Sequence, residues 1–225
     1  MPVISSYGKG TALPLLLVSA GIALGGSFLQ PPVLAWVSAG LGAALAVLTL
    51  WFFRDPERPL PPECRVLGAV VSPADGRIVA VATEPWAPYV EEEVVRISIF
   101  LSPLDVHVNR VPASGIVQYY RYLPGNFLAA YRAEASQRNE QTHIGVQTPC
   151  GRLLFKQIAG VLARRIVCTL HEGQHVQAGE RFGMMKFGSR MDILLPRRQA
   201  RVFVHVGMRV RAGQTLLAHL CPEHG

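Results

Sequence analysis

A glycine followed by a serine, Gly188-Ser189, lies within Met184–Pro196, between two stretches rich in strand-forming residues. Glycine accepts strained backbone angles and has no side chain, so the serine hydroxyl can reach the preceding carbonyl carbon. Attack would convert the peptide bond into an ester, and β-elimination would then cut the chain after Gly188. Residue 189 would become dehydroalanine, which hydrolyses to a pyruvoyl group. A pyruvoyl ketone condenses with amines and acts as an electron sink, as pyridoxal phosphate does elsewhere.

A Gly-Ser pair alone usually marks an ordinary turn, so other parts of the chain have to support this chemistry. One candidate is Asp75, whose carboxylate lies on the turn Ser72–Gly76 at the entry to an expected strand. An Asx turn, in which the side chain bonds nearby backbone, is the simpler interpretation of this residue taken alone. Asp75 therefore becomes a site candidate only together with a second polar segment.

That second segment is Ser102–Pro112. Asp105, His107 and Asn109 alternate toward one face of the extended chain, while Arg110 points toward the other. A stripe of Asp, His and Asn directly after an apolar strand is unfavourable in a core and typical of a site. Histidine is the usual acid or base near neutral pH, and both self-cleavage and a decarboxylation would need such a group.

Beyond about residue 60 the chain is rich in short β-branched segments bounded by Pro, Gly or Asp, which are typical of strands. These segments are Ala69–Val71, Gly76–Val81, Val94–Phe100, Gly115–Tyr120 and Arg201–Val206. One helix is expected, from Asn126 to about Asn139. Its apolar side would comprise Phe127, Leu128, Ala130, Tyr131 and Ala135. The pattern predicts a mainly β (α+β) fold, a compact barrel or sandwich.

Two pairs of segments repeat loosely within this part. Pro73–Val79 resembles Pro112–Val117, and Gly173–Gly179 resembles Gly207–Gly213. The second pair is similar to the turns that join strands in biotinyl and lipoyl carrier domains. In a carrier, Lys186 would lie about where the modified lysine is displayed. A non-enzymatic, membrane-anchored carrier or adaptor is therefore an alternative function.

The N-terminal part is apolar. No Asp, Glu, Lys or Arg occurs from Thr11 to Phe53, and Gln30-Pro31-Pro32 divides this stretch into segments of about 11–29 and 33–53. Each is about 20 residues long, the length that crosses a hydrocarbon core of about 30 Å. The sequence predicts a two-helix membrane hairpin, and a buried helical pair in a soluble core is the alternative.

Charges flanking the hairpin predict its orientation. Lys9 precedes the first apolar segment, and Arg54 and Arg58 follow the second, so the positive-inside tendency places both ends in the cytoplasm. A proline-rich linker follows, which sets the expected boundary between an N-terminal domain of residues 1–58 and a catalytic domain of residues 59–225.

Composition narrows the possible partners. The formal charge of +7 and pI near 9.6 suit an anionic membrane surface. Nucleic acid is not an expected partner, because no Lys/Arg run interleaved with aromatic residues occurs. The four cysteines lie far apart without a C-x-x-C pair, so we expect no metal site or disulfide framework and a reducing compartment.

Four motifs occur in a fixed order, and together they carry a family resemblance. They are Ser-Pro-Ala-Asp-Gly (72–76), Ser-Pro-Leu-Asp-Val-His-Val-Asn-Arg (102–110), Pro-Gly-Asn-Phe through Arg-Asn-Glu (124–140) and Phe-Gly-Ser-Arg-Met-Asp-Ile-Leu-Leu-Pro (187–196). From about Phe52 to the C-terminus the chain resembles the phosphatidylserine decarboxylase proenzymes of the short, archaeal-type subfamily.

The resemblance implies self-cleavage between Gly188 and Ser189 into a β chain (1–188) and an α chain (189–225). The two chains would form a heterodimer, alone or within a larger oligomer. The cofactor would be the pyruvoyl group made from Ser189, with no metal. The implied reaction converts phosphatidylserine to phosphatidylethanolamine through a Schiff base with this group, at the cytoplasmic side of the cell (inner) membrane. A pyruvoyl decarboxylase of a soluble amino acid is the nearest alternative.

The resemblance also implies roles for single residues. Asp75 matches an aspartate assigned to maturation, and His107 matches the first histidine of an H-x-x-H pattern in the longer enzymes. Arg110 stands at the second histidine's position, so His107 would serve both steps or another histidine would substitute. The substitutes by residue type are His143, His171, His175 and His205. Arg110, Asn139 and Arg190 are expected to contact the substrate.

Overall fold

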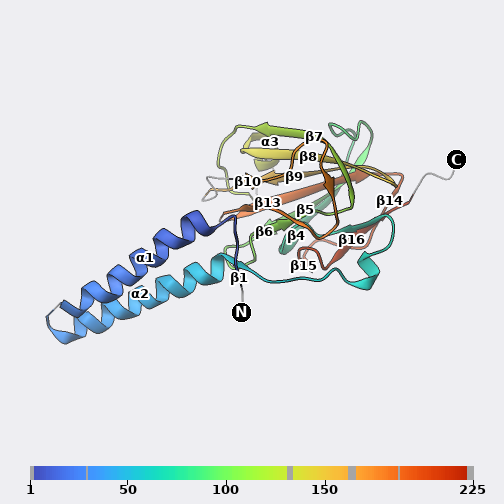
Figure 1. Ribbon diagram of the computed structural model, residues 1–225. Helices are drawn as coiled ribbons and strands as arrows, with labels where there is room; N and C mark the ends of the chain where they lie inside the picture. Colours follow the sequence, from blue (N-terminus) through green and yellow to red (C-terminus); the bar gives the residue numbers. More distant parts are fainter. Residues whose placement is uncertain (1–2, 29, 131–133, 162–165, 187, 222–225) are drawn as a thin grey trace. The chain divides into compact units, whose positions relative to one another are not determined.

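The computed structural model of the chain describes residues 3–28, 30–130, 134–161, 166–186 and 188–221. The chain forms two compact units, Met1–Glu57 and Arg58–Gly225. The second unit is mainly β, and the first contains the two apolar helices that the sequence predicts (Figure 1).

Two helices that lie side by side dominate the N-terminal unit. Its elements are β1 (Val3–Ile4), α1 (Lys9–Gly25), η1 (Gly26–Phe28), α2 (Pro32–Phe52) and β2 (Arg54–Asp55). The pairing of β1 with β2 closes the base of the hairpin, and the Ser38 hydroxyl donates to the Ile22 carbonyl across the helices at 2.5 Å. By length and composition, α1 with η1 and α2 are each able to cross a membrane.

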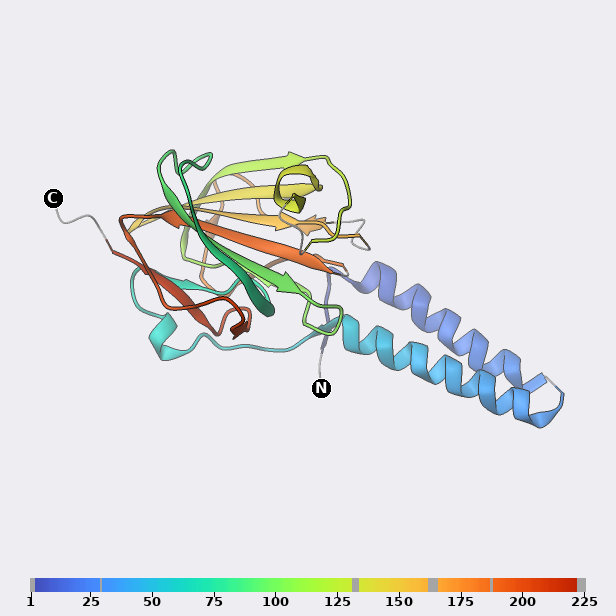
Figure 2. The same ribbon diagram turned by 180° about the vertical axis from the view of Figure 1, so that it is seen from behind.

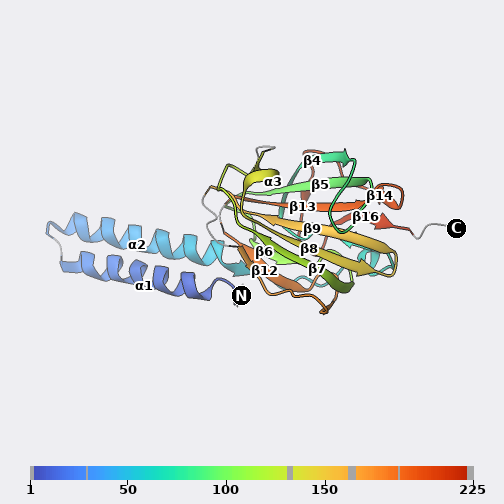
Figure 3. The same ribbon diagram turned by 90° about the horizontal axis from the view of Figure 1, so that it is seen from above.

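The main sheet of the second unit has eight strands in the order β11-β7-β8-β9-β13-β5-β4-β15, and neighbouring strands run antiparallel. The strands are β4 (Gly76–Glu84), β5 (Val94–Leu101), β7 (Gly115–Leu123), β8 (Gln141–Thr148), β9 (Gly151–Ile158), β11 (His175–Val176), β13 (Ser189–Pro196) and β15 (Arg209–Val210). Figure 3 shows β13 between β9 and β5, and Figure 2 shows the sheet from the side opposite to that of Figure 1.

Smaller elements complete this unit. One three-stranded sheet has the order β10-β12-β6 and another the order β14-β16-β3. The elements are η2 (Pro62–Cys64), β3 (Ala69–Val71), β6 (Val108–Arg110), α3 (Ala135–Arg138), β10 (Ile166–Cys168), β12 (Arg181–Met185), β14 (Ala200–Val202) and β16 (Leu216–Leu220).

The two faces of β13 contact different cores, because successive side chains of a strand point to opposite sides. Met191, Ile193 and Leu195 belong to the main hydrophobic core, and we call this side of the sheet the inner face. Leu194 packs with Leu154 in a smaller cluster on the outer face. Ser189 shares the inner face with Met191, whereas Arg190 points to the outer face.

Most predicted strands are confirmed, but one is too long. β3, β4, β5 and β7 occupy the expected segments. The predicted strand Arg201–Val206 ends at Val202 in β14. The chain turns soon afterwards, since the Met208 amide donates to the His205 carbonyl at 3.2 Å. Beyond Val202 the Phe203 amide still donates to the Leu217 carbonyl at 2.9 Å, and of residues 203–206 only Val204 is buried.

The predicted helix from Asn126 to Asn139 is wrong over most of its length. Among the described residues of this range only Ala135–Arg138 form a helix, and residues 124–129 form none. The Asn139 side chain accepts a hydrogen bond from the Leu128 amide at 2.9 Å and donates to the Leu128 carbonyl at 2.7 Å. These bonds hold the preceding segment against Asn139 and override its apolar periodicity. Tyr131, part of the expected apolar side, lies outside the described residues.

The internal repeat seen in the sequence is structural. β11, within Gly173–Gly179, pairs with the start of β7, and β15, within Gly207–Gly213, pairs with the start of β4. The Gly173 amide donates to the Val117 carbonyl and the Gly207 amide to the Ile78 carbonyl, both at 2.8 Å. Each turn of the second repeated pair thus packs on a member of the first pair.

Candidate active site

Ser189 is the first residue of β13, and this strand is hydrogen-bonded on both edges. Ser189 lies opposite Leu101 of β5, and Arg190 lies between Phe100 of β5 and Ile158 of β9. Ser189 is fully buried, and its hydroxyl makes no hydrogen bond to any described residue. Gly188 has a φ of 61°, in the left-handed region that glycine favours. The predicted nucleophile is therefore buried, unengaged and preceded by a residue suited to a tight turn.

The strand pair β6 and β12 brings His107 toward the cleavage segment. Val108 lies opposite Met184, and the Met185 amide donates to the His107 carbonyl at 3.3 Å. Met185 is separated from Ser189 by only three residues. The His107 side chain is completely buried. The two residues on which the predicted chemistry depends most are thus carried by adjoining elements.

A buried amide pair lines the inner face beside these residues. The Gln157 Nε2 donates to the Asn109 Oδ1 at 2.9 Å, and both side chains are completely buried. Gln157 belongs to β9 and lies opposite Met191 of β13, which is two residues after Ser189. The Gln157 Oε1 and Asn109 Nδ2 have no hydrogen-bond partner in the described chain. Buried polar atoms normally have partners, so these two mark the inner face as a place for a polar group.

Gln157 was not identified from the sequence, although a signal exists. On β9, Leu153 and Phe155 point to the inner face, and Gln157 continues their alternation. A glutamine at a position where this alternation predicts an apolar core residue indicates a functional side chain.

Asp75 lies at the same end of the main sheet as Ser189 but is held by other groups. Arg77 lies opposite Phe100, which lies opposite Arg190, so the start of β4 is level with the start of β13. Both Asp75 carboxylate oxygens are bound by Arg58, one of them at 2.8 Å, and the Ala212 amide donates to the other at 2.8 Å. Arg58 was expected only as the last residue before the domain boundary, and its ion pair with Asp75 was not predicted from the sequence.

The three residues expected to contact the substrate are buried and engaged with protein groups. Arg110 donates to the Gly179 carbonyl at 2.8 Å. Asn139 also donates to the Ala159 carbonyl, at 2.7 Å. Arg190 binds both carboxylate oxygens of Asp192, at 2.6 and 3.0 Å, on the face opposite Ser189. These contacts position the backbone around the cleavage strand.

A polar row crosses the outer face of the sheet. Its members lie opposite one another on neighbouring strands and are Arg121, His143, Lys156, Asp192 and Ser98. Burial, together with the charges of Lys156 and Arg121, lowers the pKa of His143 to about 3. Burial also lowers the pKa of Lys156, which the Asp192 carboxylate partly opposes. His143 is thus neutral at pH 7 and faces away from Ser189.

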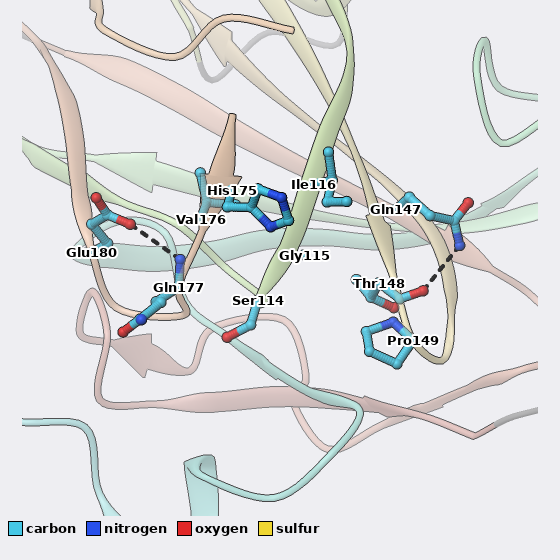
Figure 4. A pocket seen from close by; sticks show the side chains of 10 residues that line it. All are labelled: Ser114, Gly115, Ile116, Gln147, Thr148, Pro149, His175, Val176, Gln177 and Glu180. Atoms are coloured by element: carbon cyan, nitrogen blue, oxygen red, sulfur yellow. Dashed lines mark hydrogen bonds between the residues drawn. The ribbon is translucent and has the colours of Figure 1, made fainter. Parts of the chain in front are cut away.

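His175, another candidate histidine, lies apart from the cleavage strand. His175 lines a surface cavity of about 860 Å³ together with the start of β7 and the end of β8 (Figure 4). Strand pairing relates Arg190 through Ile158 and Gln141 to Leu123, which is the last residue of β7, whereas the cavity lies at the first residues of β7. Leu123 and Ile116 are seven residues apart on that strand, about 23 Å at about 3.3 Å per residue. This cavity is not the site of the predicted chemistry.

His171 and His205 belong to exposed turns of the repeat. The residues that the structure describes contain no group of three or more His, Cys, Asp or Glu side chains placed to hold a metal ion.

The sequence of this chain is similar to those of known proteins. Residues 45–218 match the phosphatidylserine decarboxylase family. The chain is 49% identical over 197 residues to the phosphatidylserine decarboxylase proenzyme of Salinibacter ruber, covering 85% of this chain and 86% of that protein. It is 41% identical over 216 residues to the same proenzyme of Chlorobium luteolum, covering 96% and 99%. For the proenzyme of Symbiobacterium thermophilum the identity is 45% over 186 residues, covering 82% and 85%. The matched span includes the four motifs that carry the sequence resemblance.

Replacement of His143 by Gln should make the fold less sensitive to acid. The folded chain keeps His143 neutral down to about pH 3, whereas the unfolded chain protonates it below about pH 6.5. The unfolded state binds the extra proton between these values, so this group lowers stability as the pH falls. Thermal unfolding from pH 7 to pH 4 should show a smaller fall in midpoint for H143Q. His175→Gln, at an exposed imidazole, is the control, and equal slopes for H143Q and wild type would contradict the assignment.

Proposed function

Since this chain belongs to the phosphatidylserine decarboxylase family, we propose that it matures by cutting its Gly188-Ser189 bond and that Ser189 becomes its pyruvoyl group. The chain is a proenzyme that cleaves itself into α and β chains and decarboxylates phosphatidylserine. Family membership overturns the alternative of a non-enzymatic carrier displaying Lys186. A soluble amino acid as substrate loses its support for the same reason.

One observation carries the proposed cleavage site. Ser189 is buried at the start of a strand held on both edges, with an unengaged hydroxyl and a left-handed glycine before it. The hydroxyl is therefore available to its own backbone. The inner face beside it contains unpaired amide atoms of Asn109 and Gln157, so a small polar group such as a pyruvoyl fits there. When present, that group supplies an electron sink for loss of carbon dioxide.

The chain's own residues would bind, orient and move protons around this group. We assign proton transfer to His107, because it is a buried imidazole directly before β6, and its carbonyl accepts from the Met185 amide next to the cleavage segment. Asp75 is assigned to maturation, through the Arg58 ion pair that fixes the turn before β4. Arg110 is the remaining candidate for binding the substrate's carboxylate or phosphate.

Asn139 and Arg190 have clearer roles as positioning residues. Asn139 ties the segment near Leu128 to Ala159, at the end of β9. Arg190 lies on the outer face, where it binds Asp192 and donates to the Ser98 hydroxyl at 2.9 Å. Both hold strands that flank Ser189, and substrate contact is not required for either role.

The substrate is a two-chain lipid, so we propose that the Ser189 end of the catalytic unit meets the bilayer surface. Removal of a lipid from the membrane is costly, since each CH2 contributes about 0.8 kcal/mol. Leu104, Tyr122, Phe127 and Val161 lie in or beside the loops that follow β5, β7 and β9 at this end, and they are 67%, 51%, 38% and 54% exposed. These four residues, which we call the apolar rim, would enter the headgroup region. The net charge of +7 favours anionic phosphatidylserine.

Family membership also supports proposals for the membrane hairpin, the repeated turns and the association of the two chains. The hairpin of α1 and α2 would span the cell (inner) membrane, with the catalytic domain beginning near residue 59 on the cytoplasmic side. The repeated turns would present the cleavage hairpin much as biotinyl and lipoyl carriers present their lysine. The α and β chains would remain together as a heterodimer, alone or within a larger oligomer.

Activity on the lipid tests the residue assignments. Ser189→Ala should yield no phosphatidylethanolamine from phosphatidylserine in detergent micelles, because it removes the pyruvoyl source. His107→Ala should lower turnover by about 10²-fold or more in any fraction that has matured, as loss of a proton-transfer group does. The control is His175→Ala, at an exposed histidine near the opposite end of β7. Wild-type turnover by matured H107A would remove His107 from the mechanism, and release of carbon dioxide from free serine would contradict the lipid substrate.

The apolar rim has a separate test. The double variant Leu104→Ser with Val161→Ser should lower kcat/KM on phosphatidylserine vesicles roughly threefold to tenfold. A loss of about 1.4 kcal/mol of apolar burial in the membrane corresponds to a tenfold weaker association. Its activity on a water-soluble, short-chain phosphatidylserine should be unchanged. Leu67→Ser, at a 65% exposed residue near Thr148 at the opposite end, is the matched control. Equal losses on both substrates would contradict membrane docking by the rim.

A further inference from the structure

The carbonyl oxygen of the bond proposed for cleavage lies directly against Gly160. A Cβ atom built on Gly160 would come within 1.7 Å of the Gly188 carbonyl oxygen and 2.9 Å of its carbonyl carbon. Side chains never approach a carbonyl so closely, since real Cβ contacts begin at about 3.0 Å. Only a glycine at position 160 leaves space for this carbonyl as it now lies.

Gly188 itself imposes a different requirement. A Cβ at Gly188 would meet no described atom within 4 Å, so its left-handed φ of 61° is what calls for glycine there. One glycine thus shapes the backbone of the cleaved bond, and the other provides the surface on which the carbonyl of that bond rests. The two requirements are independent.

Gly160 is also held firmly in place. The Ala159 amide donates to the Glu140 carbonyl at 2.9 Å, and the Ala159 carbonyl accepts from the Asn139 side chain at 2.7 Å. On the other side, Arg190 is paired with both β5 and β9. A methyl group at position 160 would therefore displace the Gly188 carbonyl, which lies between these two fixed parts, more readily than either part itself.

We propose that Gly160 is a positioning residue for self-cleavage: it seats the Gly188 carbonyl so that the Ser189 hydroxyl can attack it. This inference rests on the proposed cleavage site and adds a residue that touches the reacting carbonyl without taking part in proton transfer. A misplacement of about 1 Å between reacting groups can cost about 10²-fold in rate. The methyl group of an alanine demands a displacement of this size, from 1.7 Å to at least 3.0 Å.

The step concerned is the N-to-O acyl shift. The Ser189 oxygen bonds to the Gly188 carbonyl carbon while its proton passes to a base, for which His107 is our candidate. The carbon–nitrogen bond breaks, and the nitrogen takes up a proton to become the amine of residue 189, leaving an ester. Loss of the α-proton of residue 189 then expels the Gly188 carboxylate. Water finally releases ammonia from the dehydroalanine, which leaves the pyruvoyl group.

Gly160→Ala is the test variant, and Gly115→Ala is its matched control. A Cβ on Gly115 would likewise meet a carbonyl, that of Gln147, at 2.2 Å, but on strands far from Ser189. In purified full-length protein, G160A should mature about 10²-fold more slowly than wild type, followed by the intact masses of the chains. G115A should mature at close to the wild-type rate. Maturation of G160A at the wild-type rate would overturn the proposal.

Folding is separated from positioning in a background that cannot be cleaved. The urea unfolding of Ser189→Ala is compared with that of the double variants carrying G160A or G115A. We expect similar losses of stability from the two alanines, so that slow maturation of G160A is not a folding defect. If G160A unfolds the Ser189→Ala chain while G115A does not, the slow maturation is a folding defect and the proposal fails.

Hydroxylamine identifies the blocked step, because it cleaves esters but not peptide bonds under mild conditions. G160A should give no hydroxylamine-dependent cleavage after Gly188, since its ester would not form. Accumulation of a hydroxylamine-sensitive chain would show that the acyl shift proceeds and would overturn the proposal. A wild-type chain that is not cut at residue 188 would overturn the cleavage site as well, so the two failures are distinguishable.

Discussion

The pairing of β13 on both of its edges is the constraint on which the rest of the structure depends. The strand pairs with β5 from Ser189 to Pro196 and with β9 from Arg190 to Leu194, and both partners precede the proposed cut. Breaking the bond before Ser189 would therefore separate β13 from residue 188 and leave its pairing with β5 and β9 in place. Beyond β13, β15 pairs with β4 in the same main sheet and β16 pairs with β3 in a smaller sheet, and these pairings would hold the α chain to the β chain after the proposed cut.

The inner face near Ser189 combines burial with incomplete hydrogen bonding. The Ser189 hydroxyl, the Asn109 Nδ2 and the Gln157 Oε1 are buried without partners among the residues described. Each such atom costs about 1–3 kcal/mol relative to a paired one. This cost is consistent with the proposed site, where a free hydroxyl would attack and a carbonyl group and a polar headgroup would later be accommodated. Arg58, Asn139 and Arg190 stabilise the surrounding backbone.

Sequence reasoning predicted the parts whose causes are local. Strand composition predicted β3, β4, β5 and β7, and the repeated turns predicted an internal repeat. The helix expected from Asn126 was wrong because Asn139 binds the backbone of Leu128, a contact that no periodicity reveals. The motifs pointed to Ser189, His107 and Asp75, whose roles stay predictions. Gly160 and the partner of Asp75 were missed because they depend on contacts between segments that only the fold brings together, whereas Gln157 interrupts a local apolar alternation.

The intact mass of the purified wild-type protein under denaturing conditions shows whether the chain cuts itself at the Gly188-Ser189 bond. We expect two chains, residues 1–188 and 189–225, with the smaller chain lacking an N-terminal amine. A single unmodified chain, or a cut at another bond, would contradict this expectation.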